Sequence, residues 1–257
     1  MTSFGIGEIG IVLLLILVSF DAKQIGKFLR WIREIRSKFN RMQTNFKYQF
    51  DNLLVEEERK EELSKTPNVS ADMRNWGANQ VKKITSIKKF EASKLLVSSL
   101  ASFQPLIDAK VIAAYSSLYD ELDTSLLLKK ILAEKKTLVL PYLKNDQMFF
   151  APIEDLGRDT KTGMFGILEP IEEFRKKDFP SPDLFFIPGR CFDEYGGRIG
   201  RGKGYYDKFL VDGKGTRIGL GLDAQISSKK LSLQEHDQIM DYIISEKRII
   251  KVKEANS

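Results

Sequence analysis

The chain has 257 residues and a net charge of +6, with 42% hydrophobic and 30% charged residues, a composition typical of a globular protein with room for one large domain and an appendage. Its only cysteine, Cys191, excludes an internal disulfide bond, and its only histidine, His236, argues against a histidine-based metal cluster or a Ser-His-Asp triad. Residues 1–50 hold eight Lys or Arg and three Asp or Glu, so most of the net charge lies there. This distribution argues against a nucleic-acid-binding domain, whose basic patch would lie on the globular part.

The first predicted element is a short transmembrane helix over residues 5–20. Residues 6–20 are almost wholly apolar, although this run is shorter than the roughly 20 residues usual for a span and contains Glu8. No positive charge precedes the run and no small-x-small cleavage site follows it, which argues against a signal peptide. A buried core helix is the alternative.

Residues 22–50 are predicted to form a basic amphipathic helix on an anionic membrane surface. Apolar residues recur at helical spacing from Ile25 to Phe46, and the other faces carry Lys and Arg, with Trp31 among them. A coiled-coil or partner helix is the alternative. Because the basic flank follows the apolar run, the positive-inside rule predicts a single-pass membrane protein with its C-terminal domain in the cytoplasm.

The segments Phe4-Gly5-Ile6-Gly7-Glu8 and Lys23-Gln24-Ile25 resemble the start of the small single-span subunits of the twin-arginine translocase. The hinge of that family usually reads Gly-Pro, and Asp21-Ala22 stands here instead. The resemblance covers about the first 50 residues. It implies a membrane anchor and makes translocase subunits candidate partners.

The main domain is predicted over residues 71–257, after a charged linker over residues 51–70 that Pro67 interrupts. A helix is expected over residues 71–103 and another over 124–134. Strands are expected over residues 110–115, 137–142, 148–153, 184–188 and 216–222. This alternation predicts an α/β fold with a mostly parallel sheet flanked by helices, and places a binding site outside the carboxyl ends of the strands.

The most informative stretch of the chain, residues 196–207, holds five glycines with three cations, two tyrosines and a carboxylate, in the order Arg198, Arg201, Lys203, Tyr205, Tyr206 and Asp207. Backbone N–H groups in a glycine turn form an anion-binding concavity, and the cations suit phosphate oxygens. The carboxylate suits Mg²⁺, and the tyrosines offer flat faces. We therefore predict a nucleotide-phosphate site beside a pocket for a flat substrate.

Two familiar motifs are excluded for this stretch. A P-loop needs Ser or Thr where Gly204 stands, and a dinucleotide fingerprint needs a spacing other than G-x-G-x-G. A glycine-rich surface loop with solvated charges is the alternative.

Together with the upstream segment Ile187–Asp193, this stretch resembles the 5-formyltetrahydrofolate cyclo-ligase (methenyltetrahydrofolate synthetase) family. Glu121–Thr124, Gly166–Pro170, and Glu235–Asp237 followed by Asp241 resemble further segments of that family, so the resemblance extends over about residues 74–252. It implies a cyclo-ligase-like fold and an ATP- and Mg²⁺-dependent conversion of 5-formyltetrahydrofolate to 5,10-methenyltetrahydrofolate through a phosphorylated formyl group.

The resemblance also implies residue roles. Catalysis falls to Arg201, Lys203 and Tyr206, and substrate binding to Glu121, Tyr205 and Tyr206. ATP binding falls to Arg74 and to Arg198, Ile199, Gly200, Arg201, Gly202, Lys203, Gly204, Tyr205 and Tyr206, while Asp207 and Asp237 would hold Mg²⁺. Ser70 stands where the family usually has a lysine, and Arg190-Cys191 replaces a small or apolar pair. The alternative function is a translocase-like scaffold with an inactive cyclo-ligase-like domain.

Overall fold

The computed structural model describes residues 69–163, 166–211 and 213–252, which all belong to one compact unit spanning residues 57–257. The predicted transmembrane helix, the amphipathic helix and nearly all of the charged linker lie outside the described residues. Within the described ranges, no helix is long and apolar enough to cross a membrane. Val69 and Ser70, expected to end the linker, instead begin helix α3 (Val69–Lys82).

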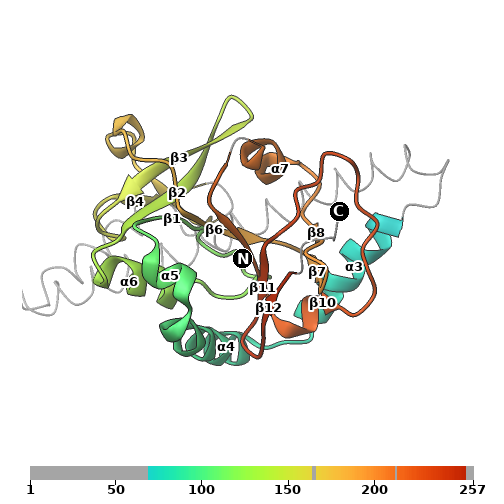
Figure 1. The fold of residues 1–257 in the computed structure, drawn as a ribbon. Coiled ribbons are helices and arrows are strands. Elements are labelled where there is room, and N and C mark those ends of the chain that lie inside the picture. The colour runs from blue at the N-terminus through green and yellow to red at the C-terminus, as the bar shows by residue number, and fades with distance from the viewer. Residues whose placement is uncertain (1–68, 164–165, 212, 253–257) are drawn as a thin grey trace, which may run out of the picture. The chain divides into compact units, whose positions relative to one another are not determined.

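A seven-stranded sheet forms the centre of the domain (Figure 1). In spatial order its strands are β12 (Ile249–Lys251), β11 (Tyr242–Ile244), β9 (Thr216–Leu220), β6 (Leu184–Pro188), β1 (Val111–Ala113), β2 (Thr137–Lys144) and β3 (Gln147–Ile153). The inner strands pair in parallel, and the two edge strands are antiparallel to their neighbours. The predicted α/β fold with a mostly parallel sheet is therefore confirmed.

The inner strands bury side chains on both faces of the sheet, as β6 shows. Leu184 and Phe186 belong to one hydrophobic cluster, whereas Phe185 and Ile187 belong to another. The first cluster is completed by α4 (Ser86–Ser99), α5 (Gln104–Asp108) and α6 (Ser125–Ala133), and the second by α7 (Tyr205–Leu210). An uninterrupted apolar run suits a parallel strand that is covered on both faces.

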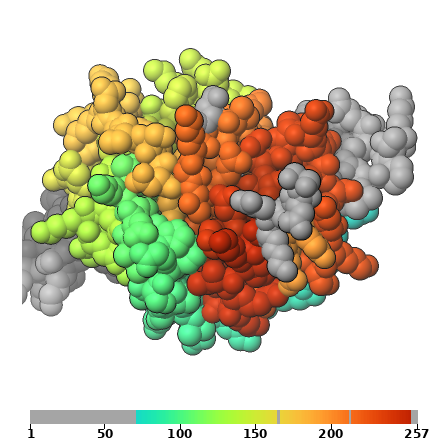
Figure 2. Space-filling view, viewed as in Figure 1, coloured from blue at the N-terminus to red at the C-terminus, as the bar shows by residue number. Residues whose placement is uncertain are grey.

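The C-terminal strands pack against the segment around α5. In Figures 1 and 2, α5 (green) lies beside β11 and β12 (red). Phe103, just before α5, meets Tyr242 of β11 edge to face, with ring centroids 5.1 Å apart. Edge-to-face contact places the positive rim of one ring on the negative face of the other, which adds to the area that the rings bury.

Strands β2 and β3 form a hairpin whose turn depends on Asn145 and Asp146. Both residues have positive φ angles, 50° and 58°, and Lys144 pairs with Gln147 across the turn. Two consecutive residues with positive φ suit the type I′ turn, whose twist matches that of the flanking strands. The strands expected over residues 137–142 and 148–153 are thus confirmed with slightly longer bounds.

The single helix expected over residues 71–103 is wrong. The chain forms α3, then α4, a short 3₁₀ helix η1 (Leu100–Ser102) and then α5. Helix α3 ends at Lys82, and α4 begins after Thr85, whose hydroxyl accepts the amide hydrogen of Lys88 and caps α4. The apolar spacing on the two sides of this break is helical, so periodicity alone does not reveal the break.

Shorter elements outside the predicted set complete the domain. One small sheet contains β10 (Ile226–Ser227), β7 (Cys191–Asp193) and β8 (Arg198–Ile199), and another pairs β4 (Thr160–Thr162) with β5 (Leu168–Pro170). The 3₁₀ helices η3 (Phe174–Lys176) and η4 (Asp223–Gln225) lie in connections. Elements of two or three residues carry too little periodicity to be recognised in a sequence.

The side of the sheet on which successive strands are added changes between β1 and β6. After β1 it continues to β2 on one side, and after β6 it continues to β9 and β11 on the other side. Ligands of open α/β sheets bind at such a switch point, in the crevice outside the carboxyl ends of the strands. The segment after β1 contains Asp120 and Glu121, and the segment after β6 leads through Arg190 to the glycine stretch. The topology therefore selects this edge of the sheet for a site.

Candidate active site

The glycine loop, residues 200–204, connects β8 to α7. Upstream of it, buried Asp193 accepts amide hydrogens from Tyr195 and Gly197 at 2.8 and 2.7 Å, which shapes the turn between β7 and β8. Gly202 and Gly204 have φ angles of +93° and +67°, in the left-handed region that glycine adopts without steric cost. These residues turn the chain sharply into α7 and leave Gly202 exposed.

An ion pair joins the two ends of this loop. Arg198 of β8 donates from Nη2 to Oδ1 of Asp207 at 2.6 Å, and from Nη1 to the carbonyl oxygen of Pro188 at 3.3 Å. The Arg198 side chain is 3% exposed. The sequence predicted that Arg198 contacts phosphate. In the structure its side chain points inward and pairs with Asp207, the carboxylate that was predicted to hold Mg²⁺.

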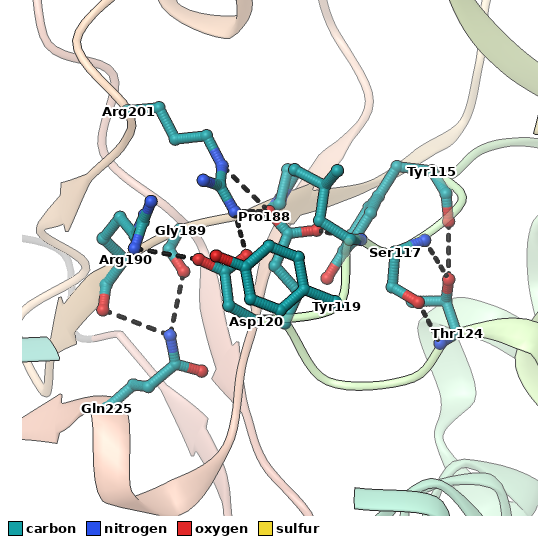
Figure 3. A network of polar contacts seen from close by, with 12 residues as sticks. Tyr115, Ser117, Tyr119, Asp120, Thr124, Pro188, Gly189, Arg190, Arg201 and Gln225 are labelled. Carbon is teal, nitrogen blue, oxygen red and sulfur yellow. Dashed lines mark hydrogen bonds and ion pairs between the residues drawn. The ribbon is translucent and has the colours of Figure 1, made fainter. Parts of the chain in front are cut away.

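A second group of charges lies at the switch point and is shown in Figure 3. The Arg201 guanidinium donates to Asp120 through Nη2, and to Oε1 of Glu121 at 3.2 Å from Nη2 and 3.4 Å from Nε. Arg190 pairs with the other oxygen of Asp120 at 2.9 Å. Arg201 lies about 80 residues from its partners in the sequence. The structure thus brings together two predicted site residues, Glu121 and Arg201, and adds Asp120 and Arg190 to them.

The backbone around Arg190 is fixed by Gln225 of η4, as Figure 3 also shows. The Gln225 amide nitrogen donates to the carbonyl oxygens of Gly189 and Arg190, both at 3.1 Å. The Arg190 amide donates to the carbonyl oxygen of Ile199 at 2.8 Å. Ile199 therefore contributes its backbone, while its side chain is buried.

Glu121 lies in a buried environment with two tyrosines. Its Oε2 accepts the amide hydrogen of Leu118 at 2.9 Å, and its side chain is 8% exposed. Burial raises the pKa of Tyr115 and that of Tyr206 well above the ordinary phenol value, and the negative charge of Glu121 raises both further. Both phenols therefore stay protonated at neutral pH, and the Tyr115 hydroxyl donates to the carbonyl oxygen of Leu220 at 3.3 Å.

Tyr205 points to a different surface from Tyr206. Its hydroxyl donates to Asp146 of the β2–β3 turn at 2.5 Å, and burial together with this bond raises its pKa to about 12. It borders a cavity of about 430 Å³ whose walls include Met148, Phe149, Phe185, Lys208 and Phe209. The volume and the aromatic walls are in the range of small-molecule sites. The adjacent tyrosines thus face two sides of α7.

Two further predicted phosphate ligands differ in environment. Arg74 of α3 donates from Nε to the carbonyl oxygen of Gly200 at 3.0 Å, so α3 contacts the glycine loop directly. Lys203 lies exposed at the tip of the loop. Both positions are compatible with the predicted contacts to an anionic ligand at the loop.

The predicted magnesium ligands, Asp207 and Asp237, lie on neighbouring segments, because the Gln238 amide donates to Oδ1 of Asp207 at 3.4 Å. Asp237 Oδ2 accepts the amide hydrogen of Gln234 at 2.8 Å. Within the described residues no group of three or more Cys, His, Asp or Glu is placed to hold a metal. A pair of carboxylates still fits Mg²⁺, which binds one or two protein carboxylates and completes its shell with water and phosphate oxygens.

Cys191 and His236 take no part in this arrangement. Cys191 is fully buried, and burial raises the pKa of its thiol to about 12, so it behaves as a small apolar residue. His236 is exposed and lies beside Asp237.

The fold and the site together define a class: an α/β protein with a glycine- and arginine-rich loop at the switch point of a mostly parallel sheet. The family model described as the 5-formyltetrahydrofolate cyclo-ligase family matches residues 62–246. The chain belongs to that family. The predicted resemblance of the main domain is therefore confirmed, while the translocase resemblance of residues 1–50 lies outside this match and stays a prediction.

Curated and solved relatives agree with this assignment. Over 181 residues the chain is 27% identical to 5-formyltetrahydrofolate cyclo-ligase of Mus musculus, covering 65% of this chain and 88% of the relative. A cyclo-ligase of Haemophilus influenzae is also 27% identical, with 67% and 92% covered. The solved structure of Aquifex aeolicus 5,10-methenyltetrahydrofolate synthetase matches with a TM-score of 0.65 and 25% identity, covering 74% of this chain and 96% of that one. The protein is an enzyme of this family.

Sequence reasoning did not identify four residues of the site: Asp120, Arg190, Asp193 and Gln225. Asp120 directly precedes Glu121, and this pair of adjacent acids is the signal in the sequence that could have identified it. Arg190 was noticed only as a departure from the family. Gln225 gives no signal in the sequence, because its role depends on the contact of η4 with the carbonyl oxygens of Gly189 and Arg190, just before β7.

Proposed function

We propose that this protein converts 5-formyltetrahydrofolate to 5,10-methenyltetrahydrofolate at the expense of ATP. The observation that carries the proposal is the contact of Glu121 with Arg201 at the switch point of the sheet, beside the glycine loop. Glu121 is a carboxylate suited to a pterin ring, and Arg201 is a cation suited to phosphate. The two side chains are hydrogen-bonded to each other. The names of the relatives give the same substrate and product.

The chemistry requires activation of the formyl oxygen, which is a poor leaving group. Transfer of the γ-phosphoryl group from ATP to this oxygen breaks the bond to ADP and forms an iminium phosphate. The neighbouring nitrogen attacks the formyl carbon, and the new carbon–nitrogen bond closes the ring. Phosphate then leaves with the proton that the attacking nitrogen gives up. Such a reaction depends on positioning and charge neutralisation more than on a protein nucleophile.

The residues of the site supply these two requirements. In the proposal, Arg201 and Lys203 offset the charge of the transferred phosphoryl group. Residues 198–206 hold ATP through their backbone N–H groups, with Arg74 as a further phosphate contact. Glu121 accepts hydrogen bonds from the pterin, and the buried hydroxyl of Tyr206 donates toward the reacting atoms. The predicted role of Tyr205 in substrate binding stays a prediction, because its hydroxyl points to Asp146, on a different side of α7 from Tyr206.

Asp207 and Asp237 are the residues proposed to hold Mg²⁺. When bound, the ion supplies positive charge against the phosphate oxygens of ATP. The ion pair with Arg198 keeps the Asp207 carboxylate in one orientation, and both hydrogen bonds to Asp207 in the described residues use Oδ1. This arrangement leaves Oδ2 as the oxygen for the metal.

A direct assay tests the proposal. Purified full-length protein is mixed with ATP, Mg²⁺ and 5-formyltetrahydrofolate, and methenyl product is followed by its absorbance together with ADP release. We expect one ADP for each product molecule, and no product when ATP is omitted or when EDTA is added. Absence of product in the complete mixture would favour the alternative, an inactive cyclo-ligase-like domain on a membrane scaffold, for which Ser70 in place of the family's lysine is the supporting observation.

We further propose that residues 1–50 anchor the enzyme to a membrane, with the catalytic domain on the cytoplasmic side. The apolar run of residues 6–20 and the basic helix pattern that follows it support this proposal. Full-length protein is expected in the membrane fraction after carbonate washing, whereas a chain lacking residues 1–50 is expected in the supernatant. Full-length protein found wholly in the supernatant would contradict it. Co-purification with translocase subunits would test the candidate partners.

A further inference from the structure

Arg190 lies on one side of the charged cluster and has no role in the function proposed above. Its Nη1 is 2.9 Å from Oδ2 of Asp120, and the Asp120 side chain is 6% exposed. On the other side, Arg201 occupies Oδ1 of the same carboxylate. One buried acid therefore bridges two arginines (Figure 3).

Stability alone does not explain an arginine at this position. The Nε atom of Arg190 is buried and makes no hydrogen bond within the described part of the chain. A buried charged donor without a partner is costly, and burying a guanidinium is costly in itself. An apolar side chain would avoid both costs, so the geometry calls for a different contribution from Arg190.

That contribution follows from what Arg201 does during the proposed reaction. In the proposed reaction, a phosphate that contacts the Arg201 guanidinium competes with Asp120 and Glu121 for its N–H donors. Glu121 keeps the Leu118 amide on its other oxygen when this happens. Asp120 would be left as a buried anion without a partner if Arg201 were its only cation, and such a group is strongly unfavourable. Arg190 remains on Asp120 and removes this penalty.

We propose that Arg190 is a positioning residue that holds Asp120 so that Arg201 can turn to the phosphates of ATP. The inference rests on the proposed use of ATP by this site. In this scheme Arg190 does not touch substrate. It sets how firmly Asp120 retains Arg201, and therefore sets the affinity for ATP.

The backbone geometry supports a fixed Arg190 and a movable Arg201. Gln225 and Ile199 hold the Arg190 backbone through hydrogen bonds, and an added Cβ on Gly77 of α3 would lie 1.9 Å from the Arg190 carbonyl oxygen. Arg201, by contrast, belongs to the glycine loop and is followed by exposed Gly202.

Lys89 is the other cation near these acids. Its ammonium donates to the Tyr119 carbonyl oxygen at 2.6 Å, and its pKa is lowered by burial, with Asp120 and Glu121 acting in the opposite direction. Lys89 therefore interacts electrostatically with Asp120, but its hydrogen bond goes to the backbone carbonyl of Tyr119 and not to the Asp120 carboxylate. Arg190 is the residue that pairs with Asp120 on the side away from Arg201.

The test compares Arg190→Met, which keeps the length of the side chain, with Arg190→Lys, which keeps the charge. The dissociation constant of Mg-ATP is measured by titration calorimetry on full-length protein, so the result does not depend on turnover. We expect Arg190→Met to weaken ATP binding at least about tenfold, because Asp120 then retains Arg201. Arg190→Lys should stay within about threefold of wild type.

A double variant separates positioning from a structural role. Adding Asp120→Asn to Arg190→Met removes the anion that holds Arg201, so ATP binding should return to within about threefold of wild type. Steady-state kinetics should show the loss in Arg190→Met in the KM for ATP, with kcat within about twofold of wild type.

Three results would overturn the proposal. They are unchanged ATP affinity in Arg190→Met, a double variant that binds no better than Arg190→Met, and a loss confined to kcat. If Arg190→Met does not fold, as judged by its thermal transition, Arg190→Gln takes its place in the same comparison. Wild-type protein that binds ATP but makes no product would contradict the proposed function and leave this inference standing, whereas wild-type protein that binds no ATP would contradict both.

Discussion

Arg198 and Asp207, nine residues apart, form a partly buried ion pair of 2.6 Å that closes the base of the glycine loop. The pair ties β8 to α7 and so joins the two ends of the loop, while Gly202 and Lys203 between them are exposed. The same carboxylate is the proposed magnesium ligand. Loop geometry and metal binding therefore depend on one side chain.

Asp207→Asn is expected to lower kcat by about 100-fold or more, because the amide is a poor magnesium ligand and no longer offsets the charge of Arg198. Methenyl product formation at saturating ATP and substrate provides the measurement. Asp178→Asn is the matched control, since Asp178 is exposed and lies outside the site. Wild-type turnover in purified Asp207→Asn would refute the assignment of this carboxylate.

Lys203→Met is expected to reduce kcat/KM for ATP about tenfold or more, through loss of one charge on the phosphates. Because Lys203 is exposed, the thermal transition should stay close to that of wild type. Lys214→Met removes an exposed lysine after α7 and serves as the control. Equal kinetics for the two variants would show that Lys203 is a solvated surface charge, the alternative left open by the sequence.

Gly77→Ala is expected to destabilise the domain although alanine favours helix. Helix propensity predicts a gain of about 1 kcal/mol for this change in the interior of α3. The added Cβ would lie 1.9 Å from the backbone carbonyl oxygen of Arg190, however, and a backbone atom cannot move aside cheaply. Overpacking of this kind typically costs about 1–3 kcal/mol, so the net effect should be destabilising.

Urea unfolding measures the effect of Gly77→Ala, and Asn79→Ala, an exposed position on the same helix, is the control. ATP affinity should fall as well, because α3 carries Arg74 to the glycine loop. A Gly77→Ala protein that is more stable than wild type would mean that α3 does not pack on the β7 segment as closely as described.

Asp159 should make stability depend on pH in the acid range. Asp159 is fully buried, and burial by itself would raise the pKa of its carboxyl group. Hydrogen bonds from Arg158 and from the amides of Glu154 and Asp155 outweigh burial and hold the pKa below its usual value. The unfolded chain therefore binds the proton more readily, so this stabilisation is present above the unfolded pKa of about 4 and is lost as pH falls through the folded pKa.

Asp159→Asn should accordingly be less stable than wild type at pH 7, and the difference should shrink as the pH is lowered below about 4. Urea midpoints for the two proteins between pH 7 and the acid range provide the measurement. Asp178→Asn should track wild type throughout. A difference between wild type and Asp159→Asn that stays constant down to the acid limit would show that the folded pKa of Asp159 is not depressed.

The sequence predicted the sheet well and the site in part. Buried strands such as β6 have runs of apolar residues that are distinctive over five positions. The break between Lys82 and Ser86 was missed because the stretches on its two sides both have helical spacing. Among the site residues, those in the glycine stretch were found because glycine, arginine and tyrosine are concentrated there, whereas Gln225 acts through contacts that leave no local pattern.

By itself, the sequence determined the α/β class and the family of the main domain, since these depend on local spacing and composition, and it predicts anion binding by residues 196–207. Only the tertiary structure decided that Arg198 faces inward to Asp207, that Tyr205 and Tyr206 serve different surfaces, and that Asp120 bridges Arg190 and Arg201. The physical reason is strand order. Asp120 follows β1 and Arg190 follows β6. These two parallel strands are neighbours because, after β2 and β3 on one side of β1, the chain returns to form β6 on the other side.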